Sequence, residues 1–297
     1  MKRSRGEKIF NYFNIIFFLF LAVIMMVPML YVLKQSLDLE GHTNRKLTLW
    51  PEVFTYAYYR MIVTKQGIYR PFLNSIIITA IGTSMVVTLN AMGAYTMSKR
   101  WLRGSKFFVY FLVVIPMVFS GGIIANFLLR KYIGLIDTMW VLILPLAANG
   151  WYMILMRNFF WTIPISLVES AQIDGASEYY VFRKIILPLS KAVLAAIGLF
   201  AGVTFWNTFR DAIFYINDPM KITFPVKLRS MLFLDQGNEA LFESTMLAMD
   251  LDVFAIMLIN EGLRAAMIIV AVIPVLLVYP FLQRYFTKGL LIGSIKG

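Results

Sequence analysis

Long apolar runs recur along this sequence and constrain its fold more than any other feature. A helix crosses a bilayer with about 20 predominantly apolar residues, and six segments satisfy that need by length and composition. They are 12–33, 73–97, 107–129, 138–156, 192–213 and 265–286. Of the 297 residues, 60% are hydrophobic, whereas soluble domains average about 45–50%. We therefore predict one all-α integral-membrane domain over 12–286, with about six transmembrane helices.

Basic residues flank alternate ends of these segments and so predict an orientation. They cluster in 1–11, in 99–106, in 157–191 and in 288–296. Lys and Arg are enriched in cytoplasmic loops of membrane proteins. We expect a cytoplasmic N-terminus (1–11), a cytoplasmic loop at 158–191 and a cytoplasmic C-terminal tail (287–297). Loops 34–72 and 215–264 are then extracytoplasmic; the first also carries basic residues, but long loops translocate despite charge.

The same composition excludes several functions. The net charge of +12 lies beside apolar segments instead of on one soluble face, so we expect no nucleic-acid partner. The chain has no cysteine and a single histidine, His42, which excludes thiol catalysis, zinc–thiolate sites and a histidine relay. It also lacks the G-x-x-x-x-G-K-[ST] loop that cradles ATP phosphates. We predict that the chain is not an enzyme and holds neither metal nor cofactor.

The segment 158–191 differs from the apolar runs and reads as two short amphipathic helices. Pro164 starts the first helix, whose apolar side we place at Leu167, Val168, Ala171 and Ile173. Gly175 is expected to end the first helix. The second covers 176–186, with Pro188 predicted to stop it. The corner Asp174-Gly175-Ala176 is small enough for another protein's backbone to approach, which suggests a docking element.

The spacing within this segment resembles a known motif. Glu169-Ser170-Ala171, then Gly175 after three residues, then Ile185-Ile186-Leu187-Pro188 after nine more, is similar to the EAA loop of ABC-importer permease subunits. Only Ser170 departs from that pattern. The stretches 134–138, Trp206-Asn207 and 288–297 further resemble carbohydrate-uptake permeases related to the maltose system, especially those importing polysaccharide fragments such as alginate or pectin oligosaccharides.

This resemblance implies a type I importer fold in the bacterial inner (plasma) membrane, and an assembly around it. The implied partners are a second homologous permease, two cytoplasmic ATPases that bind ATP and magnesium, and an extracytoplasmic solute-binding protein. The chain would then contact membrane lipid and form half of an oligosaccharide path. In the family the EAA hairpin docks on the ATPase, and the alternative is a polar loop without a partner. The expected contact residues are Glu169, Ser170, Ala171, Asp174, Gly175, Ala176, Tyr179, Phe182 and Arg183.

Polar residues in or near the apolar segments suggest where substrate passes. The candidates are Asn126, Asn149, Trp206, Asn207, Arg210 and Asp211. Intramembrane polar groups commonly face a cavity, but interhelical hydrogen bonds explain the asparagines equally well. Trp206 one helical turn before Arg210 suits stacking on a sugar and binding of a carboxylate or hydroxyls. A salt bridge to the second permease is the alternative for Arg210 and Asp211.

Three rival functions remain open from the sequence. An importer for another solute, such as peptides or polyamines, would carry the same EAA loop. An ion-coupled carrier would transport without ATP, and a membrane enzyme would need a nucleophile or metal cluster that we do not find. The outer loop 215–264, which is rich in Asp and Glu, is expected to contact the solute-binding protein.

Overall fold

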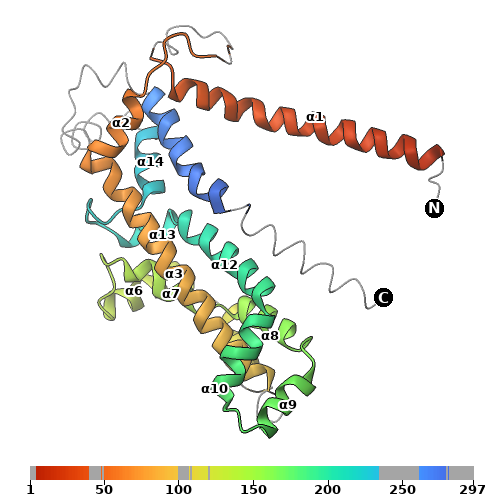
Figure 1. Cartoon of the computed structure of the whole chain (residues 1–297). Helices are drawn as coiled ribbons and strands as arrows, with labels where there is room; N and C mark the ends of the chain where they lie inside the picture. Colours follow the sequence, from red (N-terminus) through yellow and green to blue (C-terminus); the bar gives the residue numbers. More distant parts are fainter. Residues whose placement is uncertain are drawn as a thin grey trace. The chain divides into compact units, whose positions relative to one another are not determined.

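The computed structural model describes residues 5–39, 48, 50–99, 107, 109–119, 121–233, 261–278 and 280 (Figure 1). In these ranges the chain is helical, and its extended backbone is limited to an isolated bridge between Asp38 and Phe54. The chain divides into a first unit, Met1–Tyr69 with Leu228–Ile273, and a second unit, Arg70–Lys227 with Pro274–Gly297. The predicted all-α fold is confirmed.

The first unit begins with α1 (Arg5–Ser36), a helix that continues through Pro28. Its span Gly6–Ser36 buries none of its most apolar window inside the protein. So large an unburied apolar surface requires lipid or another apolar partner around it. The helix therefore has the length and surface of a membrane span, and it is longer at both ends than the predicted segment 12–33.

A buried ion pair ends α1 and connects it to the following chain. Lys34 Nζ lies 2.8 Å from the Asp38 carboxylate, and both side chains are buried. Asp38 also accepts hydrogen bonds from the backbone amides of Glu52 and Val53, at 3.2 and 3.3 Å. The Ser36 and Tyr59 hydroxyls lie 2.7 Å apart, which joins α1 to α2 (Ala57–Thr64).

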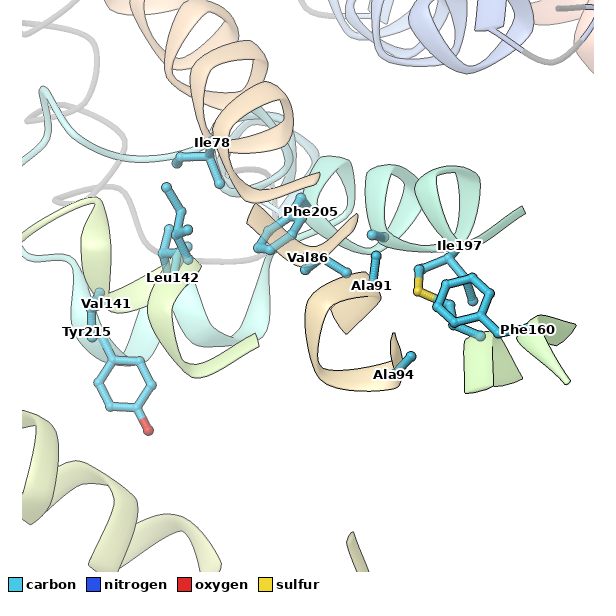
Figure 2. Packing of buried hydrophobic residues seen from close by; sticks show 14 of the residues in the cluster. Ile78, Val86, Ala91, Ala94, Val141, Leu142, Phe160, Ile197, Phe205 and Tyr215 are labelled. Atoms are coloured by element: carbon cyan, nitrogen blue, oxygen red, sulfur yellow. The ribbon is translucent and has the colours of Figure 1, made fainter. Parts of the chain in front are cut away.

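The second unit packs around α3 (Gln66–Ser98), α7 (Trp140–Ala147), α8 (Gly150–Phe160) and α12 (Lys191–Trp206). Figure 2 shows side chains from these four helices meeting in one apolar cluster. Gly82 lies so close to the buried Phe205 ring that a Cβ there would be 2.6 Å from it. Glycine thus allows α3 and α12 to approach closely, as small residues do in membrane bundles.

The third predicted segment, 107–129, is not one helix, and the prediction is wrong there. The structure has a π-helix η1 (Val109–Val114), a short α5 (Ile115–Val118) and a separate α6 (Gly122–Tyr132). Pro116 removes a backbone donor inside this segment. Gly122, the first residue of α6, adopts a φ of 72°, a left-handed conformation that does not continue a regular helix.

The fifth predicted segment, 192–213, is also shorter than expected. α10 (Glu178–Val181), η2 (Phe182–Ile186) and α11 (Leu187–Leu189) run directly into one another, and α12 follows at an angle of 79°. The second hairpin helix thus continues through Pro188 and ends one residue later, at Leu189, before the bend into α12. At the other end α12 stops at Trp206, and α13 (Arg210–Tyr215) is a separate helix.

The number of membrane-spanning helices depends on how two bent helix pairs are counted. In the described part of the chain, Gly6–Ser36, Gly67–Ser98 and Glu261–Val278 are each long and apolar enough to cross a membrane. Two bent pairs, α7 with α8 at 43° and Glu178–Leu189 with α12, can each form one further span. Asn149 and Pro145 lie at the first bend. The predicted total of six and the predicted orientation stay predictions.

Candidate functional site

The predicted hairpin in 158–191 has a tightly defined corner. α9 (Ile165–Ile173) ends in a turn at Asp174 and Gly175, and α10 returns beside it (Figure 1). Gly175 has a φ of 81°. The Ala176 amide donates to the Ala171 carbonyl at 2.9 Å and the Gly175 amide to the Gln172 carbonyl at 3.0 Å. This is a Schellman motif, in which glycine satisfies the last carbonyls of a helix.

The corner is open on its outer side. A Cβ added to Gly175 would meet no atom within 4 Å. Six of the predicted contact residues have exposed side chains or, for Gly175, exposed backbone: Glu169, Ser170, Asp174, Gly175, Tyr179 and Arg183. The other three, Ala171, Ala176 and Phe182, are half-buried against the apolar cluster. The hairpin thus divides into an outward surface and an inward face.

The apolar side predicted for α9 is only half right. Val168 and Ala171 pack against the cluster, whereas Leu167 and Ile173 are exposed, Ile173 to 86%. A nine-residue helix makes only about two and a half turns, so its tilt can bury two of four apolar positions and leave the others outside. Leu167 and Ile173 add apolar area to the outward surface of the hairpin.

Glu178 joins the hairpin to α3, a contact that sequence reasoning missed. Its Oε2 accepts a hydrogen bond from the Tyr95 hydroxyl at 2.5 Å and lies 2.7 Å from Lys99 Nζ. Its Oε1 accepts from Gln172 Nε2 at 2.8 Å. Tyr95 also packs on Phe182, with ring centroids 5.0 Å apart. One carboxylate therefore connects both arms of the hairpin and the end of α3.

The last carbonyls of α3 receive further donors from α8 and the turn after it. Arg157 Nε donates to the Met97 carbonyl at 3.2 Å, and Trp161 Nε1 donates to the Ser98 carbonyl at 2.9 Å. The Arg157 guanidinium stacks on the Trp161 ring at 3.9 Å. Such contacts satisfy the orphan carbonyls and complement the negative end of the helix dipole. The end of α3 is consequently a fixed point for the hairpin.

Three of the six path candidates, the asparagines, make hydrogen bonds close to their own positions in the chain. Asn149 caps α8 by accepting from the Tyr152 amide at 3.2 Å, and its own amide donates to Asn90. Asn126 and Asn207 donate to the carbonyls of Gly122 and Val203, four residues earlier. Asp211 lies in the first turn of α13. The Asn149 side-chain bond is a local cap, and substrate contact by these four residues stays a prediction.

Trp206 and Arg210 do not share a helix, so the predicted one-turn spacing is wrong. Asn207 is the C-cap of α12, and Arg210 begins α13 with an exposed side chain. Within the described ranges no ion pair joins Arg210 to Asp211. Trp206 is buried, packs edge-on against Phe72 with centroids 5.7 Å apart, and lines a pocket of about 360 Å³. The remaining lining comes from Thr79, Ala80, Thr83, Ser84, Gly198, Leu199, Gly202, Val203, Pro274, Val275 and Val278.

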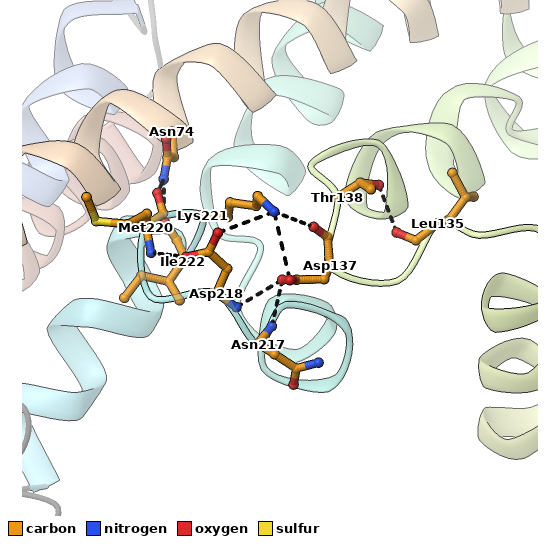
Figure 3. A network of polar contacts seen from close by, with 9 residues as sticks. All are labelled: Asn74, Leu135, Asp137, Thr138, Asn217, Asp218, Met220, Lys221 and Ile222. Carbon is orange, nitrogen blue, oxygen red and sulfur yellow. Dashed lines mark hydrogen bonds and ion pairs between the residues drawn. The ribbon is translucent and has the colours of Figure 1, made fainter.

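A polar network lies at the turn after α13 and was not predicted (Figure 3). Asp137, a non-glycine residue with a φ of 62°, accepts from the backbone amides of Asn217 and Asp218 at 3.0 and 2.9 Å. The Asp218 amide, with the Asn217 amide and Lys221, holds the pKa of Asp137 below its ordinary value. Asn74 of α3 donates to the Met220 and Ile222 carbonyls nearby. The acidic residues of 234–260 and His42 lie outside the described residues.

Comparison with known proteins places these features in a family. Residues 87–292 match the protein family described as the binding-protein-dependent transport system inner membrane component. This range contains the whole hairpin. The chain belongs to this family. The permease is 41% identical to the polygalacturonan/rhamnogalacturonan transport system permease protein YtcP of Bacillus subtilis (strain 168), over 95% of this chain and 96% of that protein. It is 38% identical to Protein LplC of the same organism, over 100% and 98%.

A solved structure is similar over nearly the full length of the permease. It is a bacterial ABC transporter involved in the import of the acidic polysaccharide alginate, with a TM-score of 0.83 and 28% identity, covering 96% of this chain and 99% of that one. The permease is thus a membrane component of an ABC importer and not an enzyme, as predicted. Family membership also implies ATPase and solute-binding-protein partners.

Proposed function

We propose that this permease forms half of the translocation path for oligosaccharides released from polysaccharides, acidic ones included. A second homologous permease supplies the other half, two ATPases supply the energy, and a solute-binding protein delivers the sugar. Support comes from relatives whose names specify polygalacturonan, rhamnogalacturonan and arabinooligosaccharides, and from the alginate importer. The permease contributes shape and positioning, while ATP and magnesium belong to the partners.

The open corner at Gly175 is the structural observation that carries the ATPase-docking part of this proposal. Gly175 has a φ of 81° and no atom lies within 4 Å of its Cβ position. Its backbone is therefore exposed to a partner. Exposed Glu169 and Asp174 beside it offer carboxylates that a partner's basic groups can bind. A corner of this kind, carried on a firmly attached hairpin, suits docking to another protein better than it suits a loop without a partner.

The proposed mechanism follows from how the hairpin is attached. Movement of docked ATPases displaces the hairpin, and the hairpin displaces α3 and α12, with which it is continuous or bonded. Packed helices move as rigid bodies between discrete arrangements. The pocket that Trp206 lines at the end of α12 is also lined by residues of α3 and of 274–278, so relative motion of α3 and α12 changes this cavity. Alternating exposure of a sugar path is the expected consequence.

Reconstituted uptake tests the proposal. Proteoliposomes would contain the permease, its partner permease and the ATPases with ATP inside, and the solute-binding protein would be added outside. We expect ATP-dependent uptake of labelled galacturonate oligosaccharides or neutral arabino-oligosaccharides, and none of a tripeptide or spermidine. Uptake of the peptide or the polyamine with no uptake of either sugar would overturn the proposed substrate class.

A further inference from the structure

We propose that Glu178 is a positioning residue that couples the hairpin to α3, so that ATPase movement reaches the end of α3 through this carboxylate in addition to the packed and continuous helices. The inference rests on the proposed function and concerns how the hairpin works. Nothing in the motif that identifies the hairpin includes Glu178 in this role. The residue lies at the first position of α10, behind the outward corner, and not on it.

The geometry shows a carboxylate whose two oxygens have separate tasks. Oε1 accepts from Gln172 near the end of α9 and so closes the hairpin on itself. Oε2 faces α3, where it receives the Tyr95 hydroxyl and the Lys99 ammonium. Charge-assisted hydrogen bonds of this length are about twice as strong as neutral ones. These contacts therefore link displacement of the hairpin to the end of α3.

Surrounding contacts reinforce the α3 side of this link. The Lys99 side chain is 14% exposed, and its ammonium lies 4.5 Å from the centre of the Tyr95 ring. The Glu178 side chain is 45% exposed, so solvent screens part of this ion pair, and the Tyr95 and Gln172 hydrogen bonds add to the link. Arg157 and Trp161 meanwhile hold the final carbonyls of α3. Glu178 thus joins the hairpin to an α3 end that also receives hydrogen bonds from α8 and the turn after it.

Two results distinguish this role from a docking role. In the Glu178→Ala permease the outward corner stays intact, so the ATPases should still co-purify at the wild-type ratio. Sugar transported per ATP hydrolysed should fall at least about fivefold, the lower range of measured coupling between sites. Tyr95→Phe, which removes one donor, should give a smaller loss in the same direction.

A charge exchange provides the matched control. Glu178→Lys alone places two ammonium groups together and should uncouple the complex, whereas Glu178→Lys with Lys99→Glu restores an opposite-charge pair and should recover part of the coupling. A purely structural loss would instead appear as a lowered melting temperature in both. Normal coupling in Glu178→Ala, or loss of the ATPases from that variant, would each overturn the proposal.

A measurement on the complex without transport keeps the test independent of substrate. The chain has no cysteine, so spin labels can be attached at cysteines introduced at the exposed positions Thr96 and Tyr180. Dipolar spectroscopy should give a narrow distance distribution with Glu178 present and a broad one with Glu178→Ala. Identical distributions would contradict the link, while absence of sugar uptake by the wild-type complex would contradict the proposed function alone.

Discussion

Arg210 remains a candidate for binding sugar although, contrary to the prediction, it does not lie one helical turn after Trp206. The residue no longer shares a helix with Trp206, yet its guanidinium is exposed at the start of α13. An exposed guanidinium can bind the carboxylates of an acidic sugar in a bidentate manner. What remains testable is a preference for charged over neutral sugars.

Replacement of Arg210 should therefore affect acidic substrates selectively. We expect Arg210→Gln to lower uptake of galacturonate oligosaccharides about tenfold, which corresponds to about 1.4 kcal/mol, and to leave arabino-oligosaccharide uptake unchanged. Arg210→Lys keeps the charge but loses the planar fork, so an intermediate loss is expected. Competition between the two labelled sugars in proteoliposomes measures the ratio. Equal losses for both sugars would indicate a structural role.

Asp38 should make folding stability depend on pH. Burial raises its pKa, but the Lys34 ammonium and the Glu52 and Val53 amides outweigh burial and hold the pKa below the ordinary 3.8. A carboxyl group whose folded pKa is lowered stabilises the fold above its unfolded pKa, and this contribution is lost as pH falls through the folded pKa. We expect Asp38→Asn to lower stability by about 3 kcal/mol at pH 7, because Lys34 is left buried without its charge partner.

In acid, the stability of the Asp38→Asn variant should approach that of the wild-type protein. Melting temperatures of the two purified proteins in one detergent, followed by intrinsic tryptophan fluorescence, should differ clearly at neutral pH and converge well below pH 3.8. Asp211→Asn, in a half-buried helix turn without that ion pair, serves as the matched control. A difference that stays constant with pH would rule out the ionised pair as the cause.

At the scale of elements, the hairpin was predicted closely and the broken spans were not. Residue spacing determines a corner such as Asp174-Gly175, because the glycine conformation is a local property of the chain. The helix breaks in 107–129 and after Trp206 depend on contacts with residues distant in the sequence, which a local pattern does not reveal. The Glu178–Tyr95 bond joins residues 83 positions apart, and no local pattern reveals such a pair.

The contact between α3 and α12 should tolerate an added methyl group at Gly198 but not at Gly82. At Gly82 a Cβ would lie 2.6 Å from the buried Phe205 ring, whereas at Gly198 the nearest atom, Val87 Cγ2, is at 3.6 Å. Both positions gain helix propensity from alanine. We expect Gly82→Ala to destabilise the permease by about 1–3 kcal/mol through overpacking, and Gly198→Ala to be neutral or stabilising. Thermal melting of both variants decides between these outcomes.

The corner of the hairpin can be tested with a pair of glycines that share a conformation. Gly175 and Gly134 have φ values of 81° and 72°, and a Cβ at either would meet nothing within 4 Å. Asparagine tolerates this conformation better than other side chains. Gly175→Asn and Gly134→Asn should thus melt alike, but only Gly175→Asn should lose ATPase co-purification, by about tenfold in affinity. Retained ATPase binding in Gly175→Asn would count against docking at this corner.

At the scale of the whole molecule, the chain has the proposed docking hairpin but lacks a phosphate-binding loop. The chain carries no phosphate-binding loop and a single histidine, while a set of polar contacts attaches the hairpin with its exposed corner to α3. A helix such as α1, unburied over its whole apolar window, likewise needs apolar surroundings that the described part of the chain does not supply. Energy and much of the apolar contact must come from other molecules.

The permease alone should consequently be inactive. Purified and reconstituted without partners, it should neither hydrolyse ATP nor accumulate labelled oligosaccharide under an imposed proton or sodium gradient, because it lacks the phosphate loop and the histidine relay that those reactions commonly use. Adding the ATPases, the second permease and the solute-binding protein should produce uptake that stops when magnesium is chelated, since phosphoryl transfer from ATP requires the metal. Gradient-driven uptake by the permease alone would show an ion-coupled carrier, and the hairpin would then need another explanation.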